Sequence, residues 1–178
     1  MKWLCLMLML AGSAVQAHSG STAYLQATVV GASVQLRTDY ALRDLDDALG
    51  VDANDDGQLT WGELQAATPA LLSYLAPRLT VAGDGMPCAL TGSPDVQVTD
   101  HSDGPYAVFQ FTGQCASEPG QWQLTNNALF EFDASHRALL RWQRGAESSS
   151  ATLTPTQRTL TLTGERGALD TLSDYLHE

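Results

Sequence analysis

The segment "AYLQATVVGASVQLRT", residues 23–38, sets the expected fold. Apolar, β-branched and aromatic side chains stand on both sides of "GAS" at 31–33, where three small residues interrupt them. Such runs are typical of strands, and the small residues between them are typical of a turn. The segment therefore predicts a β-hairpin.

The hydrophobic period changes directly after this hairpin. Leu42, Leu45 and Leu49 recur at the spacing of a short amphipathic helix, with Asp39 placed before them as a candidate N-cap. We therefore predict a helix that begins where the second strand ends.

A second helical pattern runs from Leu64 to about Ala76. Pro69 lies in its middle, directly after Thr68, and this pair resembles an N-cap followed by proline at the first helical position. Since proline inside a helix removes a backbone hydrogen bond, the pattern predicts either two helical pieces or one kinked helix.

Beyond this helix, turn-forming residues recur at short intervals between apolar runs. Leucines at helical spacing return only near the end, over about 166–177. We predict an α+β, mainly β fold: an antiparallel β-sandwich-like domain with an inserted helix–loop–helix at about 39–78 and a C-terminal helix. The candidate strands are 79–82, 87–91, 95–100, 105–112, 121–125, 128–132, 137–143, 150–154 and 158–163.

Twelve residues between the two helical patterns, "DANDDGQLTWGE" at 52–63, match a calcium-binding EF-hand loop. Gly57 stands where that loop must turn sharply, and Leu59 stands where an apolar side chain anchors it. Glu63 closes the loop as a bidentate ligand that opens the exit helix. Gln58 is expected to bind through its backbone carbonyl and Thr60 directly or through water. The expected calcium ligands are Asp52, Asn54, Asp56, Gln58, Thr60 and Glu63.

Only one such loop is present, whereas calcium sensors usually carry paired hands. Extracellular hands also bind weakly, at about 10⁻⁴–10⁻³ M, which suits a structural ion better than a switch. We therefore interpret the loop as a site where bound calcium holds the helical insert against the β domain. The alternatives are a surface turn without an ion, and pairing with another protein's hand.

The N-terminal residues 1–17, "MKWLCLMLMLAGSAVQA", resemble a cleaved secretory signal peptide. Lys2 precedes an apolar run that is too short for a membrane span, and Val15 and Ala17 have the spacing that signal peptidase requires. The mature protein is then expected to begin at His18, as one domain over 18–178, and to lie in the periplasm.

The formal net charge of the chain is −11. Binding to phosphate backbones requires clustered basic residues, and the arginines here are scattered, so nucleic acid is not an expected partner.

Cys88 and Cys115 are the two cysteines that lie outside the signal segment. In an oxidising compartment a disulfide is their favoured state. A metal or redox pair is the weaker alternative, because no C-x-x-C occurs and no histidine flanks either sulfur.

The histidines suggest an alternative function. An N-terminal His18 can chelate copper through its amine and ring, and His101 or His136 could complete such a site. With such a site the protein would be a periplasmic copper or nickel metallochaperone. The competing interpretation is that these histidines are exposed or cap strands, and that His136 forms a local salt-bridged turn with Asp133 and Arg137.

Motifs of catalysis are absent from the sequence. There is no G-x-S-x-G, no H-E-x-x-H and no phosphate-binding glycine loop, and a disulfide would leave no free cysteine as a nucleophile. We therefore do not expect an enzyme.

Several segments in order resemble a known family. These are "AHSGSTAYL" (17–25), "LRDLDDALGVDANDDGQLTWGEL" (42–64), "HSDGPYAVFQFTGQC" (101–115) and "FDASHRALLRW" (132–142). Together they are similar to the exported N-terminal region of bacterial hydrogenase/urease-accessory (HupE/UreJ-type) membrane proteins.

The resemblance implies an extracytoplasmic domain joined to a polytopic inner-membrane part associated with the handling of metal, notably nickel. It also implies calcium ligation by the loop at 52–63 and a Cys88–Cys115 disulfide. Since the chain reaches only Glu178, transport is not expected within it. It is either a free-standing or a truncated version, and the terminal helix would then mark the join.

Overall fold

The computed structural model describes residues 20–163. The expected signal peptide, His18 and the expected helix at 166–177 lie outside the described residues. Within 20–163 no helix has the length and apolar character needed to cross a membrane.

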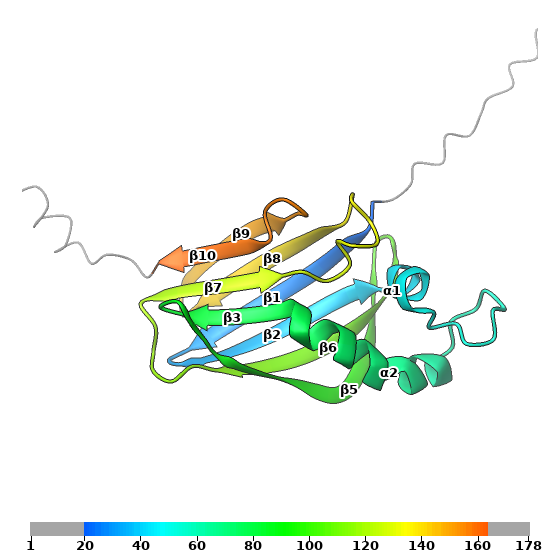
Figure 1. Ribbon diagram of the computed structural model, residues 1–178, viewed down its shortest axis with the longest axis horizontal. Helices are drawn as coiled ribbons and strands as arrows, with labels where there is room; N and C mark the ends of the chain where they lie inside the picture. Colours follow the sequence, from blue (N-terminus) through cyan, green and yellow to red (C-terminus); the bar gives the residue numbers. More distant parts are fainter. Residues whose placement is uncertain (1–19, 164–178) are drawn as a thin grey trace, which may run out of the picture.

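The larger of two sheets has six strands (Figure 1). It contains, in spatial order, β5 (Ala89–His101), β6 (Gly104–Gln114), β2 (Ser33–Ala41), β1 (Thr22–Val30), β8 (Arg137–Arg144) and β9 (Glu147–Leu153).

The predicted hairpin is confirmed. Strands β1 and β2 pair antiparallel from Ala23↔Tyr40 to Val30↔Ser33, and Gly31 takes the left-handed conformation of the turn, with φ of 57°. Side chains of β1 alternate between buried and more exposed positions, as the sequence pattern requires.

One pairing differs from the prediction of an antiparallel sheet. Strands β1 and β8 run parallel, from Thr22↔Arg137 to Val29↔Arg144. Parallel neighbours need a long crossover, and here the chain passes through both helices and six further strands before it returns beside β1.

The smaller sheet has four strands, which lie in front of the larger sheet in Figure 1. The rings of Trp122 and Trp142, one from each sheet, lie 5.5 Å apart, and buried side chains of both sheets and both helices form one hydrophobic cluster. The fold is therefore mainly β with two packed sheets, as predicted. The strands of the smaller sheet are, in order, β10 (Thr159–Thr163), β7 (Gln121–Asn126), β3 (Leu79–Gly83) and β4 (Met86–Pro87).

Two strand predictions are corrected. The candidates at 87–91 and 95–100 fall largely within the single strand β5, whose register shifts between Gly92 and Val96. The candidate at 128–132 is not a strand, because Leu129 has φ of 66° and its carbonyl accepts the N–H of Phe132 in a turn.

The insert contains helices α1 (Leu42–Leu49) and α2 (Trp61–Leu75), followed by the 3₁₀ turn η1 (Ala76–Arg78). Asp39 does not cap α1: it lies within β2, and Ala41 is the N-cap. The Asp39 side chain instead binds Arg37 and His101 on the sheet.

Helix α2 continues through Pro69, so the prediction of two helical pieces is wrong. Thr68 lies inside the helix, where its hydroxyl donates to the carbonyl of Leu64 at 2.7 Å instead of capping a new helix.

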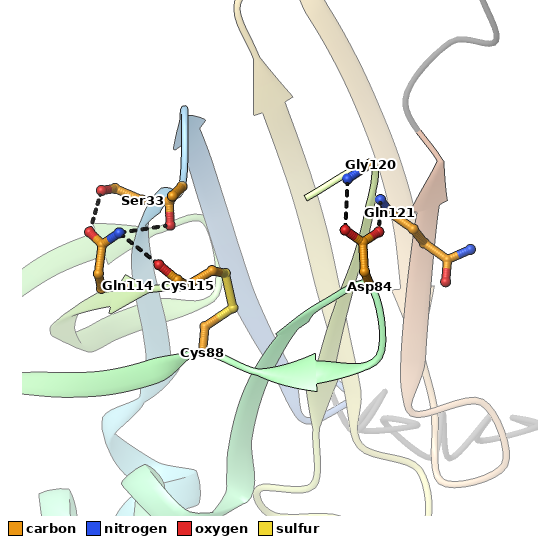
Figure 2. Close-up of a disulfide and its surroundings, with 8 residues drawn as sticks. Ser33, Asp84, Cys88, Gln114, Cys115, Gly120 and Gln121 are labelled. Carbon is orange, nitrogen blue, oxygen red and sulfur yellow. Dashed lines mark hydrogen bonds between the residues drawn. A yellow bond between two sulfur atoms is a disulfide. The ribbon is translucent and has the colours of Figure 1, made fainter. Parts of the chain in front are cut away.

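Cys88 and Cys115 form the predicted disulfide (Figure 2). Cys115 follows β6, and Cys88 stands between β4 and β5, so the bond joins the end of β6 to the point where the chain passes from the smaller sheet to the larger one. Near the disulfide, the ring of Pro119 lies so close to the backbone of Gly83 that position 83 requires glycine. A Cβ there would lie 2.2 Å from Cγ of Pro119. Next to it, the Asp84 carboxylate accepts the N–H groups at the start of β7, as Figure 2 shows.

Candidate metal-binding site

The end of α1 fixes the start of the loop at 52–63. Gly50 takes a left-handed conformation, with φ of 65°, and donates its N–H to the carbonyl of Asp46 at 2.7 Å. The Asp46 side chain then accepts the N–H of Asp52 at 2.7 Å, and Val51 between them is buried in the core. Asp46 thus holds both the C-cap of α1 and the first expected ligand, with one hydrogen bond to each.

Three expected ligands close the loop on itself. Oδ2 of Asp52 accepts the N–H of Gly57 at 2.7 Å, and Oδ1 of Asn54 accepts that of Asp56 at 2.9 Å. Oδ1 of Asp56 in turn accepts the N–H of Gln58 at 2.8 Å. Gly57 has φ of 76°, the conformation that the sequence pattern reserves for glycine. Figure 1 shows the loop projecting between the two helices.

The last two side-chain ligands form the cap of α2. Thr60 is the N-cap, and its N–H and hydroxyl donate to Oε2 of Glu63 at 2.9 and 2.7 Å, while the Thr60 hydroxyl accepts the Glu63 N–H at 3.3 Å. This is a capping box. The backbone N–H of Thr60 is the main cause of a lowered Glu63 pKa, its hydroxyl and the N–H of Asn54 add to the effect, and the nearby Asp52 carboxylate opposes it.

One buried side-chain oxygen of this loop has no hydrogen-bond partner among the described residues. Oδ1 of Asp52 is buried and bonds to nothing in residues 20–163, although Oδ2 of the same carboxylate is satisfied. A buried anionic oxygen without a partner is unfavourable, and a bound cation would compensate for it. Leu59 packs partly against the core, as expected of the anchor position, and Trp61 is half exposed beside it.

The carboxylates alone do not make a metal centre: within residues 20–163 no group of three or more His, Cys, Asp or Glu side chains is placed to hold an ion. The expected set at 52–63 combines carboxylates with an amide, a hydroxyl and a backbone carbonyl, which are ligands that calcium accepts. Calcium binding therefore stays a prediction.

The structure does not bring His101 and His136 together. Nε2 of His101 lies 3.0 Å from Oδ2 of Asp39, and its ring stacks on Tyr24 with 4.2 Å between centroids. His136 is fully buried, and its Nδ1 contacts the hydroxyl of Ser21. The structure thus provides no shared site for the two rings.

The expected salt-bridged turn at His136 is wrong, as is its expected exposure. Among the described residues neither His136 nor Arg137 forms an ion pair with Asp133, whose carboxylate accepts from Ser135. The backbone does turn there, with the His136 N–H donated to the Asp133 carbonyl. The imidazole points into the protein instead, because Ser21 offers it a buried partner.

A buried network around Ser21 has no signal in the local sequence. The Ser21 hydroxyl donates to Oδ2 of Asp44 at 2.7 Å, and since it has one proton it accepts from Nδ1–H of His136. The serine stands between acid and histidine, whereas in a hydrolase triad the histidine stands between the other two. The network therefore ties the residue before β1, helix α1 and the segment before β8 together, and it does not activate Ser21 as a nucleophile.

This network predicts a pH dependence of stability. Burial lowers the pKa of His136 from its usual 6.5, so the native state keeps a neutral ring while the unfolded chain takes up a proton. The unfolding free energy should then fall as the pH drops below about 6.5, by up to about 1.4 kcal/mol per pH unit. Urea unfolding at pH 7.5, 6.5 and 5.5 measures the loss. His136→Asn removes the titrating ring and should show a shallower decline, whereas equal declines in both proteins would contradict the assignment.

Two comparisons of the sequence find no family and no relative for this chain. A scan against protein-family models finds no match, and a search of curated proteins finds no significant match. The resemblance to the HupE/UreJ-type region therefore stays a prediction, and the geometry of the loop carries the functional interpretation.

Proposed function

We propose that the loop at 52–63 binds calcium and that the chain is an exported structural or docking module whose shape depends on that ion. The observation that carries this proposal is the Asp52 carboxylate: Oδ2 is held by the N–H of Gly57, and the buried Oδ1 lacks any partner. A hard cation with oxygen ligands would satisfy that atom.

The chemistry of the other side chains supports the same ion. Asn54, Asp56 and Thr60 present neutral or anionic oxygens, and Glu63 is kept ionised by its capping bonds. Gln58 would contribute its backbone carbonyl. When bound, calcium supplies the positive charge that offsets the repulsion between Asp52 and Glu63, and it links the end of α1 to the start of α2.

The resemblance noted for the sequence suggests where such a module would act. We place it in the periplasm, as a docking partner for a polytopic inner-membrane protein that handles metal. The loop is then a fastening for the helical insert and not the transported-metal site, because its oxygen ligands favour calcium over nickel or copper.

Terbium luminescence tests the proposal directly. Trp61 is within the loop, so excitation of its indole should sensitise a bound terbium ion, and calcium should displace the emission. Glu63→Gln should weaken terbium binding at least tenfold, because it removes one anionic ligand. An amide oxygen at 63 still accepts from Thr60, so the helix cap is retained.

Glu147→Gln is the matched control, since Glu147 is an exposed acid on β9, outside the loop. It should leave terbium binding unchanged. Absence of sensitised emission in the wild-type protein, or equal emission in Glu63→Gln, would refute calcium binding at this loop.

A further inference from the structure

The outward face of the larger sheet carries a groove of about 650 Å³ that the proposed function does not use. Side chains of β1, β2, β8 and β9 line it, together with His101 at the end of β5. None of its lining residues belongs to the loop at 52–63. The volume lies within the range of small-ligand sites.

Strand register arranges the groove in two rows. Gln26 pairs with Arg37 on one side and with Arg141 on the other, which places two guanidinium groups and an amide in a polar row. Two residues away along β1, Tyr24 pairs with Leu139 on β8 and with Asp39 on β2; we call Tyr24 and Leu139 the apolar row. Paired residues project from the same face of a sheet, and two residues along a strand span about 7 Å.

The one carboxylate among the lining residues in the described chain is already satisfied. Asp39 is 5% exposed, and Nε and Nη2 of Arg37 donate to its two oxygens at 2.7 and 2.9 Å. Nε2 of His101 lies 3.0 Å from Oδ2 of the same carboxylate. The charges of Asp39 and Arg37 therefore offset each other, which reduces the repulsion between Asp39 and an incoming anion.

Arg141 is the uncompensated charge of the groove. Its side chain is exposed and makes no hydrogen bond and no ion pair with residues 20–163. Arg144 on the same strand pairs with Glu118 at 3.3 Å, so acids are within reach of neighbouring arginines but not of Arg141. In a chain of net charge −11, a free guanidinium inside a concave site is complementary to an anionic ligand.

The apolar row is rigid and accessible. The ring of Tyr24 is stacked on His101 with an interplanar angle of 2°, and Tyr106 contacts the edges of both rings. Leu139 is 39% exposed beside it. An aliphatic or aromatic group laid over Tyr24 and Leu139 would bury this surface without displacing the stack.

We propose that this groove binds a small organic carboxylate. The carboxylate lies at Arg141 and the free Nη1 of Arg37, and the apolar body lies over Tyr24 and Leu139. The spacing of about 7 Å between the two rows fits a body of roughly five or six carbons. Serine and threonine hydroxyls of β9, at Ser150 and Thr152, border the site and add hydrogen-bonding capacity.

Nuclear magnetic resonance titration of the full chain with sodium hexanoate tests this inference. We expect saturable shifts of the backbone amides of Tyr24, Leu139 and Arg141. Hexanol lacks the charge and acetate lacks the apolar body, so each should bind at least tenfold more weakly. Arg141→Gln should weaken hexanoate binding about tenfold, the loss expected for one charge-assisted hydrogen bond.

Arg144→Gln, on the same strand but outside this groove, is the matched control and should bind hexanoate as the wild type does. Three results would each overturn the proposal: no saturable shift at millimolar hexanoate, equal affinity for hexanol, or unchanged affinity in Arg141→Gln. Concentration-dependent dimerisation that disappears in Arg141→Gln would instead assign the face to a second copy of the chain.

Discussion

Replacing Cys88 and Cys115 together by alanine should lower the unfolding free energy by about 3.5 kcal/mol. The two cysteines are 27 residues apart, and cross-linking a loop of that size removes much conformational freedom from the unfolded chain. Both residues are 93% buried at the end of the β5–β6 ladder, where Ala89 already pairs with Gln114. Urea unfolding of the oxidised protein and of the double variant measures the difference.

A reducing agent provides the control for this prediction. It should bring the wild-type unfolding midpoint close to that of the double variant and leave the variant itself unchanged. A loss below about 1 kcal/mol would mean that the unfolded chain keeps these strands together without the bond, contrary to the chain-entropy account.

Local sequence pattern was sufficient for much of this fold. The alternation around Gly31 predicts the hairpin, and the shift to leucine spacing after it predicts α1, although the helix begins after Ala41 and not after the expected cap Asp39. The same reasoning failed at 128–132, where an apolar run suggested a strand. There the Leu129 N–H donates to the hydroxyl of Tyr74 on α2. This partner lies 55 residues away in the sequence, so the local pattern does not reveal it.

Pairings between distant strands were also out of reach. Parallel contact of β1 with β8 depends on the path of the whole chain, and it is this contact that places Arg141 beside Gln26. The burial of His136 depends on Ser21, which is 115 residues away. Residue type alone suggested exposure for that histidine, because a polar ring with no visible partner is normally solvated.

The sequence specifies the candidate loop in the most detail, because its expected ligands occupy fixed offsets within twelve residues. Its support was only partly visible. The sequence contains the spacing of a capping box at Thr60 and Glu63. It does not show that the Asp46 side chain accepts the Asp52 N–H, because this bond depends on the observed turn at Gly50.

Calcium should raise the stability of the protein through this loop. With a dissociation constant of about 10⁻⁴–10⁻³ M, 10 mM calcium should increase the unfolding free energy by about 1.4–2.7 kcal/mol over the value in chelator. Glu63→Gln should lose most of this increment while its stability in chelator stays close to that of the wild type, because the amide keeps the cap on α2. Urea unfolding in chelator, in calcium and in magnesium measures the unfolding free energy of each protein under each condition.

The outcomes separate a metal role of Glu63 from a purely structural one. If Glu63 only caps α2, wild type and Glu63→Gln respond identically to calcium, and the wild-type midpoint in calcium equals that in chelator. If Glu63 binds the ion, the increment disappears in Glu63→Gln and persists in Glu147→Gln, and magnesium reproduces little of it, since its smaller octahedral shell does not suit a loop of mixed oxygens. The buried, unpartnered Oδ1 of Asp52 favours the second result, because a cation in the loop would satisfy it.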